Sequence, residues 1–168
     1  MVASRSMSPI PRRPLSRASI AARGALFTMV LIGLTGCGLA TPPPSPTPAD
    51  FQGIAGELVT RGLTIDHIVS GEAGCDDLTL KRTAIALDAS GLDQTTPTRV
   101  YIYIFRNRDS FDRLRDSVDA CARTYATDPA TYESFDVSPY VVASAGPWAP
   151  QFRAAVRAAI TKAAGTGD

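Results

Sequence analysis

The chain has 168 residues, with 17 Lys or Arg, 16 Asp or Glu and a single His, so its formal net charge is +1. Five of the arginines lie in residues 1–36, which contain no acidic residue, so residues 37–168 carry 12 basic and 16 acidic residues, a net charge of −4. A mildly acidic chain without a basic stripe argues against nucleic acid as a partner, and one histidine excludes a metal cluster of several histidines.

The first 36 residues have the pattern of an export signal. Arginines precede an apolar stretch, residues 24–34, which is shorter than the roughly 20 residues that a transmembrane helix needs. Leu34, Thr35, Gly36 and Cys37 follow it directly. An uncleaved membrane anchor is the alternative to a removed signal, and the length of the apolar stretch disfavours it.

Leu34-Thr35-Gly36-Cys37 resembles the lipobox of bacterial lipoproteins. The resemblance implies that the signal peptide is cut after Gly36 and that Cys37 carries diacylglycerol. Acyl chains such as palmitate then hold the mature protein at the extracytoplasmic face of a bacterial membrane, in the cell envelope. The resemblance covers residues 1–37 alone and implies nothing about the rest of the chain.

Three segments follow from this organisation: a signal peptide at 1–36, a lipidated cysteine with a proline-rich linker at 37–50, and a globular domain at 51–168. Residues 38–50 read GLATPPPSPTPAD, which cannot bury apolar surface and predicts an extended spacer. The globular segment is long enough for one hydrophobic core.

Cys75 and Cys121 remain as an even pair once Cys37 is assigned to the lipid. Secreted chains fold in an oxidising compartment, so we expect the pair to form a disulfide. The loop that it closes holds about 47 residues, for which the chain-entropy model gives about 4 kcal/mol. The alternative is a reactive thiol, but neither cysteine lies in a C-x-x-C motif or has a histidine nearby in the sequence.

The periodicity of apolar residues predicts an α+β fold, in which helices pack on a mostly antiparallel sheet of about four strands. Asp50 and Asp109 are the expected N-caps of two helices. Pro139 places the last strand at an edge or a bulge. The expected elements are helix 51–61, strands 63–70, 83–88 and 99–105, helix 109–125, strand 135–144 and helix 151–163.

Residues 76–82 leave an alternative open. If they form a crossover helix, the first two strands become parallel and the fold becomes ferredoxin-like. On the predicted helix 109–125, Cys121 belongs to the apolar stripe, where it can reach Cys75.

Tyr101, Tyr103 and Phe105 form the most prominent candidate binding surface. They alternate with Val100 and Ile102, so both faces of this strand are apolar. If helices cover only one side of the sheet, the aromatic face is open and binds a protein or a small apolar ligand. If the helix at 51–61 covers it, the same residues belong to the core.

The acidic residues and His67 form no catalytic constellation. Strand alternation places Asp66 and His67 on opposite faces, which denies the obvious pair. Solvated turn residues are the expected role of the other carboxylates, because the calcium-loop pattern is absent. These carboxylates are Glu72, Asp76, Asp77, Asp88 and Asp93.

Arginines crowd the start of the helix at 109–125, but aspartates interleave with them. The spacing predicts a solvent face of ion pairs, for example Arg115 with Asp119, rather than an anion site. The residues are Arg106, Arg108, Arg113 and Arg115, with Asp109, Asp112, Asp116 and Asp119.

These patterns favour a lipid-tethered, non-enzymatic binding or interaction module at the cell envelope, with no metal or cofactor. Its expected partners are the membrane, through the acyl chains, and a protein or a small apolar ligand. Two other classes stay open: a small envelope hydrolase that uses Asp66, His67 or Glu72, and a structural envelope protein.

Overall fold

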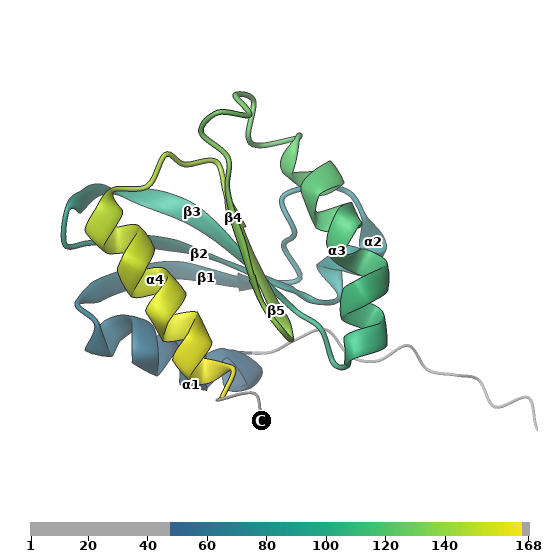
Figure 1. Ribbon diagram of the computed structural model, residues 1–168, viewed down its shortest axis with the longest axis horizontal. Coiled ribbons are helices and arrows are strands. Elements are labelled where there is room, and N and C mark those ends of the chain that lie inside the picture. The colour runs from purple at the N-terminus through teal and green to yellow at the C-terminus, as the bar shows by residue number, and fades with distance from the viewer. Residues whose placement is uncertain (1–47, 166–168) are drawn as a thin grey trace, which may run out of the picture. The chain divides into compact units, whose positions relative to one another are not determined.

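The structure is a computed structural model that describes residues 48–165; the expected signal peptide, Cys37 and the linker up to residue 47 lie outside the described residues. The described part is an α+β domain with a five-stranded antiparallel sheet and four helices, as Figure 1 shows. The elements are α1 (Pro48–Thr60), β1 (Leu63–Ser70), α2 (Leu78–Lys81), β2 (Ala84–Gly91), β3 (Gln94–Ile104), α3 (Arg108–Ala122), β4 (Glu133–Val137), β5 (Tyr140–Ser144) and α4 (Pro150–Ala163).

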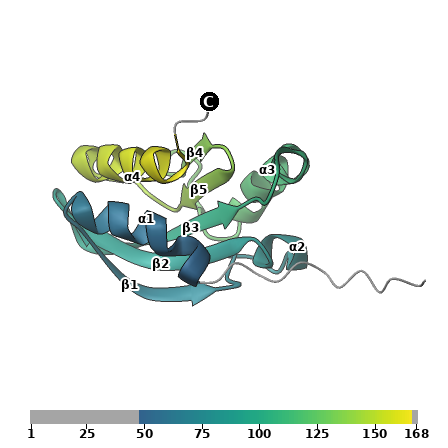
Figure 2. The ribbon, with the colours of Figure 1, turned by 90° about the horizontal axis from the view of Figure 1, so that it is seen from below.

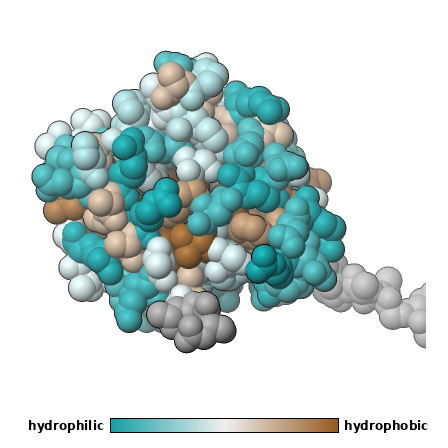
Figure 3. Space-filling model, viewed as in Figure 1, coloured by the Kyte–Doolittle hydropathy of each residue, from teal (hydrophilic) through white to brown (hydrophobic). Residues whose placement is uncertain are grey.

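The sheet has the strand order β1-β2-β3-β5-β4, and every neighbouring pair is antiparallel. Helices α1 and α4 lie side by side against one face, and α2 and α3 lie together on the other (Figures 1 and 2). The domain therefore has three layers, with the sheet in the middle. Hydrophilic residues cover most of the side seen in Figure 3.

Two apolar cores follow from the alternation along β3. Val100 and Ile102 point to the core beneath α1 and α4, which also contains Trp148 and Phe152. Tyr103 points to the second core, beneath α2 and α3. Because both faces of the central strand are buried, the expectation of a strand apolar on both sides is confirmed.

The aromatic face of β3 is covered, so of the two alternatives that the sequence left open the structure has the buried one. Tyr101, Tyr103 and Phe105 are 7%, 0% and 1% exposed. The covering helix is α3 rather than α1: its apolar stripe, which includes Val118 and Cys121, packs on these rings. An amphipathic helix must bury its apolar stripe, and the sheet face next to it supplies the partner surface.

The ferredoxin-like alternative is wrong. Helix α2 has only four residues, and β1 pairs with β2 in antiparallel register from Leu63↔Gly91 to Ser70↔Ile85. The link between β1 and β2, residues 71–83, is long enough for a crossover, but it carries only one helical turn and returns the chain in the antiparallel direction.

The expected strand at 135–144 is instead the hairpin β4-β5, so the sheet has five strands rather than four. Pro139 lies in the turn between the two strands and follows Ser138 in a cis peptide bond. Proline has no N–H for the sheet ladder, and the turn is the position that tolerates this best.

Helix ends also differ from the expectation. Helix α1 begins at Pro48, three residues before the expected start, and the N-cap of α3 is Asn107 rather than Asp109. Asn107 Oδ1 accepts the N–H of Ser110 at 2.8 Å. Helix α4 has no cap of its own; the carboxylate of Asp93, in the β2–β3 turn, accepts the N–H groups of Gln151 and Phe152, both at 2.9 Å.

The disulfide Cys75–Cys121 is confirmed, with 5.5 Å between the Cα atoms. It joins the loop after β1 to α3. Two hydrogen bonds support the same junction: Tyr103 Oη donates to Ala73 O at 2.7 Å, and Thr124 Oγ1 donates to Gly74 O at 2.7 Å. Loop 71–77 is thereby fastened over the second core. Within residues 48–165, no helix is long and apolar enough to cross a membrane.

Candidate functional site

A hollow of about 440 Å³ lies between α2 and the start of α3, and we call it the arginine pocket. Three arginines line it, from the α2–β2 junction, the β3–α3 junction and the second turn of α3. Its lining is Thr79, Arg82, Thr83, Arg106, Asn107, Ser110, Arg113 and Leu114.

Backbone contacts explain why Arg82 and Arg106 line the same hollow although 24 positions of the sequence separate them. Leu80 is fully buried and holds α2 against the second core. Thr83 O then accepts the N–H of Ile104 at 2.8 Å, which aligns the end of α2 with the end of β3. The chain continues from Ile104 into Arg106, so both arginines reach one side of the molecule.

The start of α3 supplies the opposite wall of the pocket. Asn107 caps the helix, while Ser110 and Arg113 are three residues apart and lie on one helix face. Arg113 Nη2 donates to Ser110 Oγ at 3.5 Å. Asp77 caps α2 by accepting from Thr79 N at 2.7 Å, and the disulfide joins the loop before α2 to the C-terminal end of α3.

No carboxylate lines the arginine pocket. Arg82 and Arg113 have no ion pair within residues 48–165, whereas the other arginines of α3 have carboxylate partners. The predicted Arg115–Asp119 pair is present at 2.9 Å, and Arg108 lies 3.9 Å from Asp112. The pocket is therefore positive in a domain whose described residues carry more acidic than basic groups.

The hydrogen-bonding capacity left in the pocket is mainly that of donors. Asn107 uses its amide oxygen for the helix cap, which leaves its NH₂ group. Ser110 Oγ accepts from Arg113 and keeps its own proton to donate. Together with guanidinium N–H groups, these donors suit a ligand that carries oxygen acceptors and negative charge.

The predicted aromatic site is not available for binding as expected, because Tyr103 and Phe105 are core residues. Tyr101 lines a second hollow of about 590 Å³, beside the disulfide. The charged groups there already pair: Glu72 contacts Arg99 at 2.6 Å, and Asp76 contacts Lys81 at 2.9 Å.

His67 has a partner that strand alternation does not reveal. It lies in an irregularity of β1 between Asp66 and Val69, with φ of 48°, and its Nδ1 is 3.2 Å from Asp88 Oδ2. The His67 side chain is 79% exposed, and Asp88 also accepts from Arg99 at 3.1 Å. The expectation that Asp66 is not the partner of His67 agrees with this arrangement.

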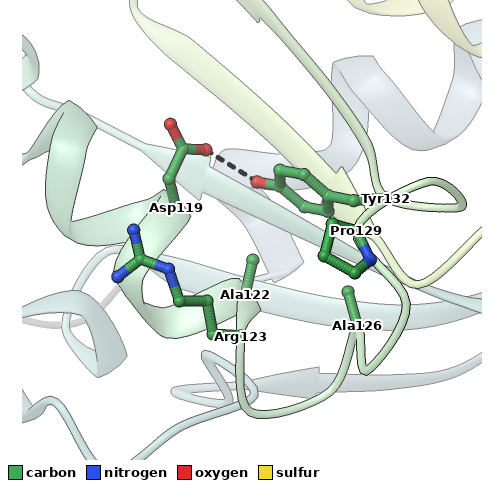
Figure 4. A pocket seen from close by; sticks show the side chains of 6 residues that line it. All are labelled: Asp119, Ala122, Arg123, Ala126, Pro129 and Tyr132. Atoms are coloured by element: carbon green, nitrogen blue, oxygen red, sulfur yellow. Dashed lines mark hydrogen bonds between the residues drawn. The ribbon is translucent and has the colours of Figure 1, made fainter.

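Another hollow, of about 260 Å³, lies at the C-terminal end of α3 (Figure 4). Two of its polar groups bind each other: Tyr132 Oη donates to Asp119 at 2.8 Å, and Arg115 also contacts Asp119. Burial raises the pKa of Tyr132 to about 12, so its hydroxyl remains a donor at neutral pH. The walls are Asp119, Ala122, Arg123, Ala126, Pro129 and Tyr132.

Arg106 and Arg113 belong to the arginine set noticed in the sequence, but Arg82 was missed. No local pattern links Arg82 to α3, because the contact depends on the pairing of residues around Thr83 and Ile104. Among the described residues, no three His, Cys, Asp or Glu side chains are close enough to hold a metal ion. No protein-family model, curated protein or solved structure matches this chain.

Proposed function

We propose that this protein is a lipid-anchored extracytoplasmic lipoprotein of the cell envelope, and that its domain binds an anionic ligand in the arginine pocket. The observation that carries the binding proposal is the gathering of Arg82, Arg106 and Arg113 around one hollow whose lining contains no carboxylate. Guanidinium groups bind phosphate, sulfate and carboxylate groups through paired N–H donors.

The lining also favours binding over catalysis. It contains serine and threonine hydroxyls but no His, Asp, Glu or Lys that could act as a general base for them. An anion held there is recognised through its charge and its acceptor oxygens. The domain is therefore proposed as a non-enzymatic binding module.

The lipobox resemblance of Leu34-Thr35-Gly36-Cys37 supports the anchor, and the disulfide Cys75–Cys121 fits an oxidising compartment. The proline-rich linker spans about 3.1 Å per residue when extended. It would allow the domain to meet its ligand some distance from the bilayer.

Thermal unfolding of the detergent-solubilised full-length protein tests the pocket. Sulfate, phosphate or citrate should raise the melting temperature more than chloride at equal ionic strength, because a ligand that binds only the folded state stabilises it. These anions also stabilise folded proteins generally, because they are excluded from the protein surface, so the double variant Arg82→Gln/Arg113→Gln should keep that general increase and lose only the part that comes from binding. Arg113→Gln alone should lose part of it, and Arg108→Gln is the matched control for this single variant: each removes one positive charge from α3, but Arg108 does not line the pocket.

Equal losses in the double variant and in Arg108→Gln would contradict the proposal, since they would show a general charge effect. The anchor has its own test. Mass spectrometry of the mature protein should find Cys37 as an acylated first residue, and Cys37→Ala should release the protein from the membrane fraction. An unmodified N-terminus elsewhere would refute the anchor.

A further inference from the structure

The arginine pocket also indicates which anion it takes. Resting on the proposed function, we infer that the ligand presents a phosphomonoester, a terminal phosphate group on a single ester oxygen, to Arg82, Arg106 and Arg113. Three features of the pocket favour such a group: its charge, its remaining hydrogen-bond donors and the absence of titrating side chains from its lining.

Charge is the first step. Three arginines line one hollow of about 440 Å³, and Arg82 and Arg113 have no carboxylate partner within residues 48–165. A group with two negative charges gains more from this arrangement than a group with one, because each guanidinium interacts with the added charge. A phosphomonoester carries about −1.5 to −2 at neutral pH, whereas a carboxylate, a sulfate ester and a phosphodiester each carry one charge.

Hydrogen bonding is the second step. The free donors come from several directions: Arg82 from the α2 side, and Asn107, Ser110 and Arg113 from the α3 side. A phosphomonoester offers three terminal oxygens, enough to accept from both walls at once. A phosphodiester or a carboxylate offers only two such oxygens.

The helix N-terminus is not the basis of this assignment. The cap residue Asn107 already occupies the N–H of Ser110, and Asp109 places a carboxylate in the first turn. The positive side chains around the hollow provide the attraction.

The third step concerns pH. The lining contains no residue that titrates between pH 5 and 8, and arginine keeps its charge throughout this range. The other charged groups on the two helices nearby are Asp77 and Lys81 on the α2 side and Arg108, Asp109 and Asp112 on the α3 side. A phosphomonoester has its own second ionisation near pH 6, so we expect a pH dependence in this range from the ligand.

Isothermal titration calorimetry of the detergent-solubilised full-length protein tests the inference with methyl phosphate, dimethyl phosphate and methyl sulfate. These probes have similar size, and only methyl phosphate becomes a dianion. At pH 7.5 we expect methyl phosphate to bind about ten-fold more tightly than the other two, the effect of one extra charge near several screened guanidinium groups.

Between pH 7.5 and 5, the affinity for methyl phosphate should fall about five-fold, because its second ionisation lies near pH 6. The affinities for methyl sulfate and dimethyl phosphate should stay constant. Arg82→Gln and Arg113→Gln should each remove most of the preference for methyl phosphate, while Arg108→Gln should keep it.

The outcomes separate this inference from the proposed function. If the three probes bind equally and without pH dependence, but binding needs Arg82 and Arg113, the pocket takes anions and the phosphomonoester assignment is wrong. If no probe binds, or if Arg108→Gln abolishes binding equally, both are wrong. If methyl phosphate is preferred, glycerol 3-phosphate and dibutanoyl phosphatidic acid identify the source of the phosphate group. Equal affinities support a soluble phosphate ester, and tighter binding of the lipid supports a lipid headgroup.

Discussion

The buried hydroxyl of Tyr103 offers the sharpest test of how loop 71–77 is held over the second core. Tyr103 is 0% exposed, and its hydroxyl donates to Ala73 O at 2.7 Å. Tyr103→Phe keeps the ring and removes only this donor. The carbonyl of Ala73 then loses a buried partner, which costs about 1–3 kcal/mol.

For a domain of this size, 1 kcal/mol corresponds to about 4 °C in melting temperature, so Tyr103→Phe should lower it by about 4–12 °C. Urea unfolding followed by circular dichroism gives the free energy directly. Tyr140→Phe is the matched control, because Tyr140 is half-buried in β5 and its hydroxyl makes no hydrogen bond within the described part of the chain. A loss in Tyr103→Phe below about 0.5 kcal/mol, or equal to that in Tyr140→Phe, would refute the reasoning.

The same hydroxyl predicts a loss of stability at alkaline pH. Burial raises the pKa of Tyr103 well above its usual value near 10. The unfolded chain therefore releases this proton at a lower pH than the folded chain, so the stabilisation is complete below pH 10 and is lost as the pH rises further. In Tyr103→Phe, the free energy of unfolding should decline less steeply above pH 10 than in the wild type.

Three other predictions concern the fold. Replacing Cys75 and Cys121 by serine should lower the free energy of unfolding by about 4 kcal/mol in the chain-entropy model, measured by urea unfolding; an unchanged value would count against the closed loop as a source of stability. Asp93→Asn should lower the melting temperature at pH 7, and the difference from the wild type should disappear in acid. Burial opposes ionisation of Asp93, but the N–H groups of Gln151 and Phe152 outweigh it and lower the pKa of this carboxyl. The stabilisation is therefore present above about pH 4 and is lost as the pH falls below it. A difference that persists at low pH would argue against this cap. Gly91→Ala should destabilise the domain, since Gly91 has φ of 125° and a Cβ would lie 2.6 Å from Gly62 O. Gly53→Ala, which has open space around it in α1, should stabilise the domain by about 0.5–1 kcal/mol. Equal effects of the two variants in thermal unfolding would contradict this difference.

Local sequence patterns predicted much of the fold because they report on short-range physics. The alternation of residues 99–105 predicted a central strand, and the stripe that ends in Cys121 predicted a helix whose cysteine reaches Cys75. The prediction failed where a turn divides one expected strand, residues 135–144, into two strands. Pro139 was read as an irregularity within one strand, although it lies in the turn of a hairpin.

The binding site shows the same division. The arginines at the start of α3 are visible in the sequence, and the Arg115–Asp119 pair was predicted correctly from helix spacing. Which of these arginines stay without a carboxylate partner depends on what packs beside α3. Arg82 joins them only because Leu80 anchors α2 and Thr83 pairs with Ile104.

The sequence alone therefore determined the types of most elements, the pairing of Cys75 with Cys121 and the expectation of a lipid anchor at Cys37, because each depends on residues near one another in the chain or on a simple count. Only the tertiary structure decided that α3 covers the aromatic face of β3 and that Arg82 lines the same hollow as Arg106 and Arg113. Both depend on contacts between distant segments, which sheet pairing and helix packing establish and which local periodicity does not encode.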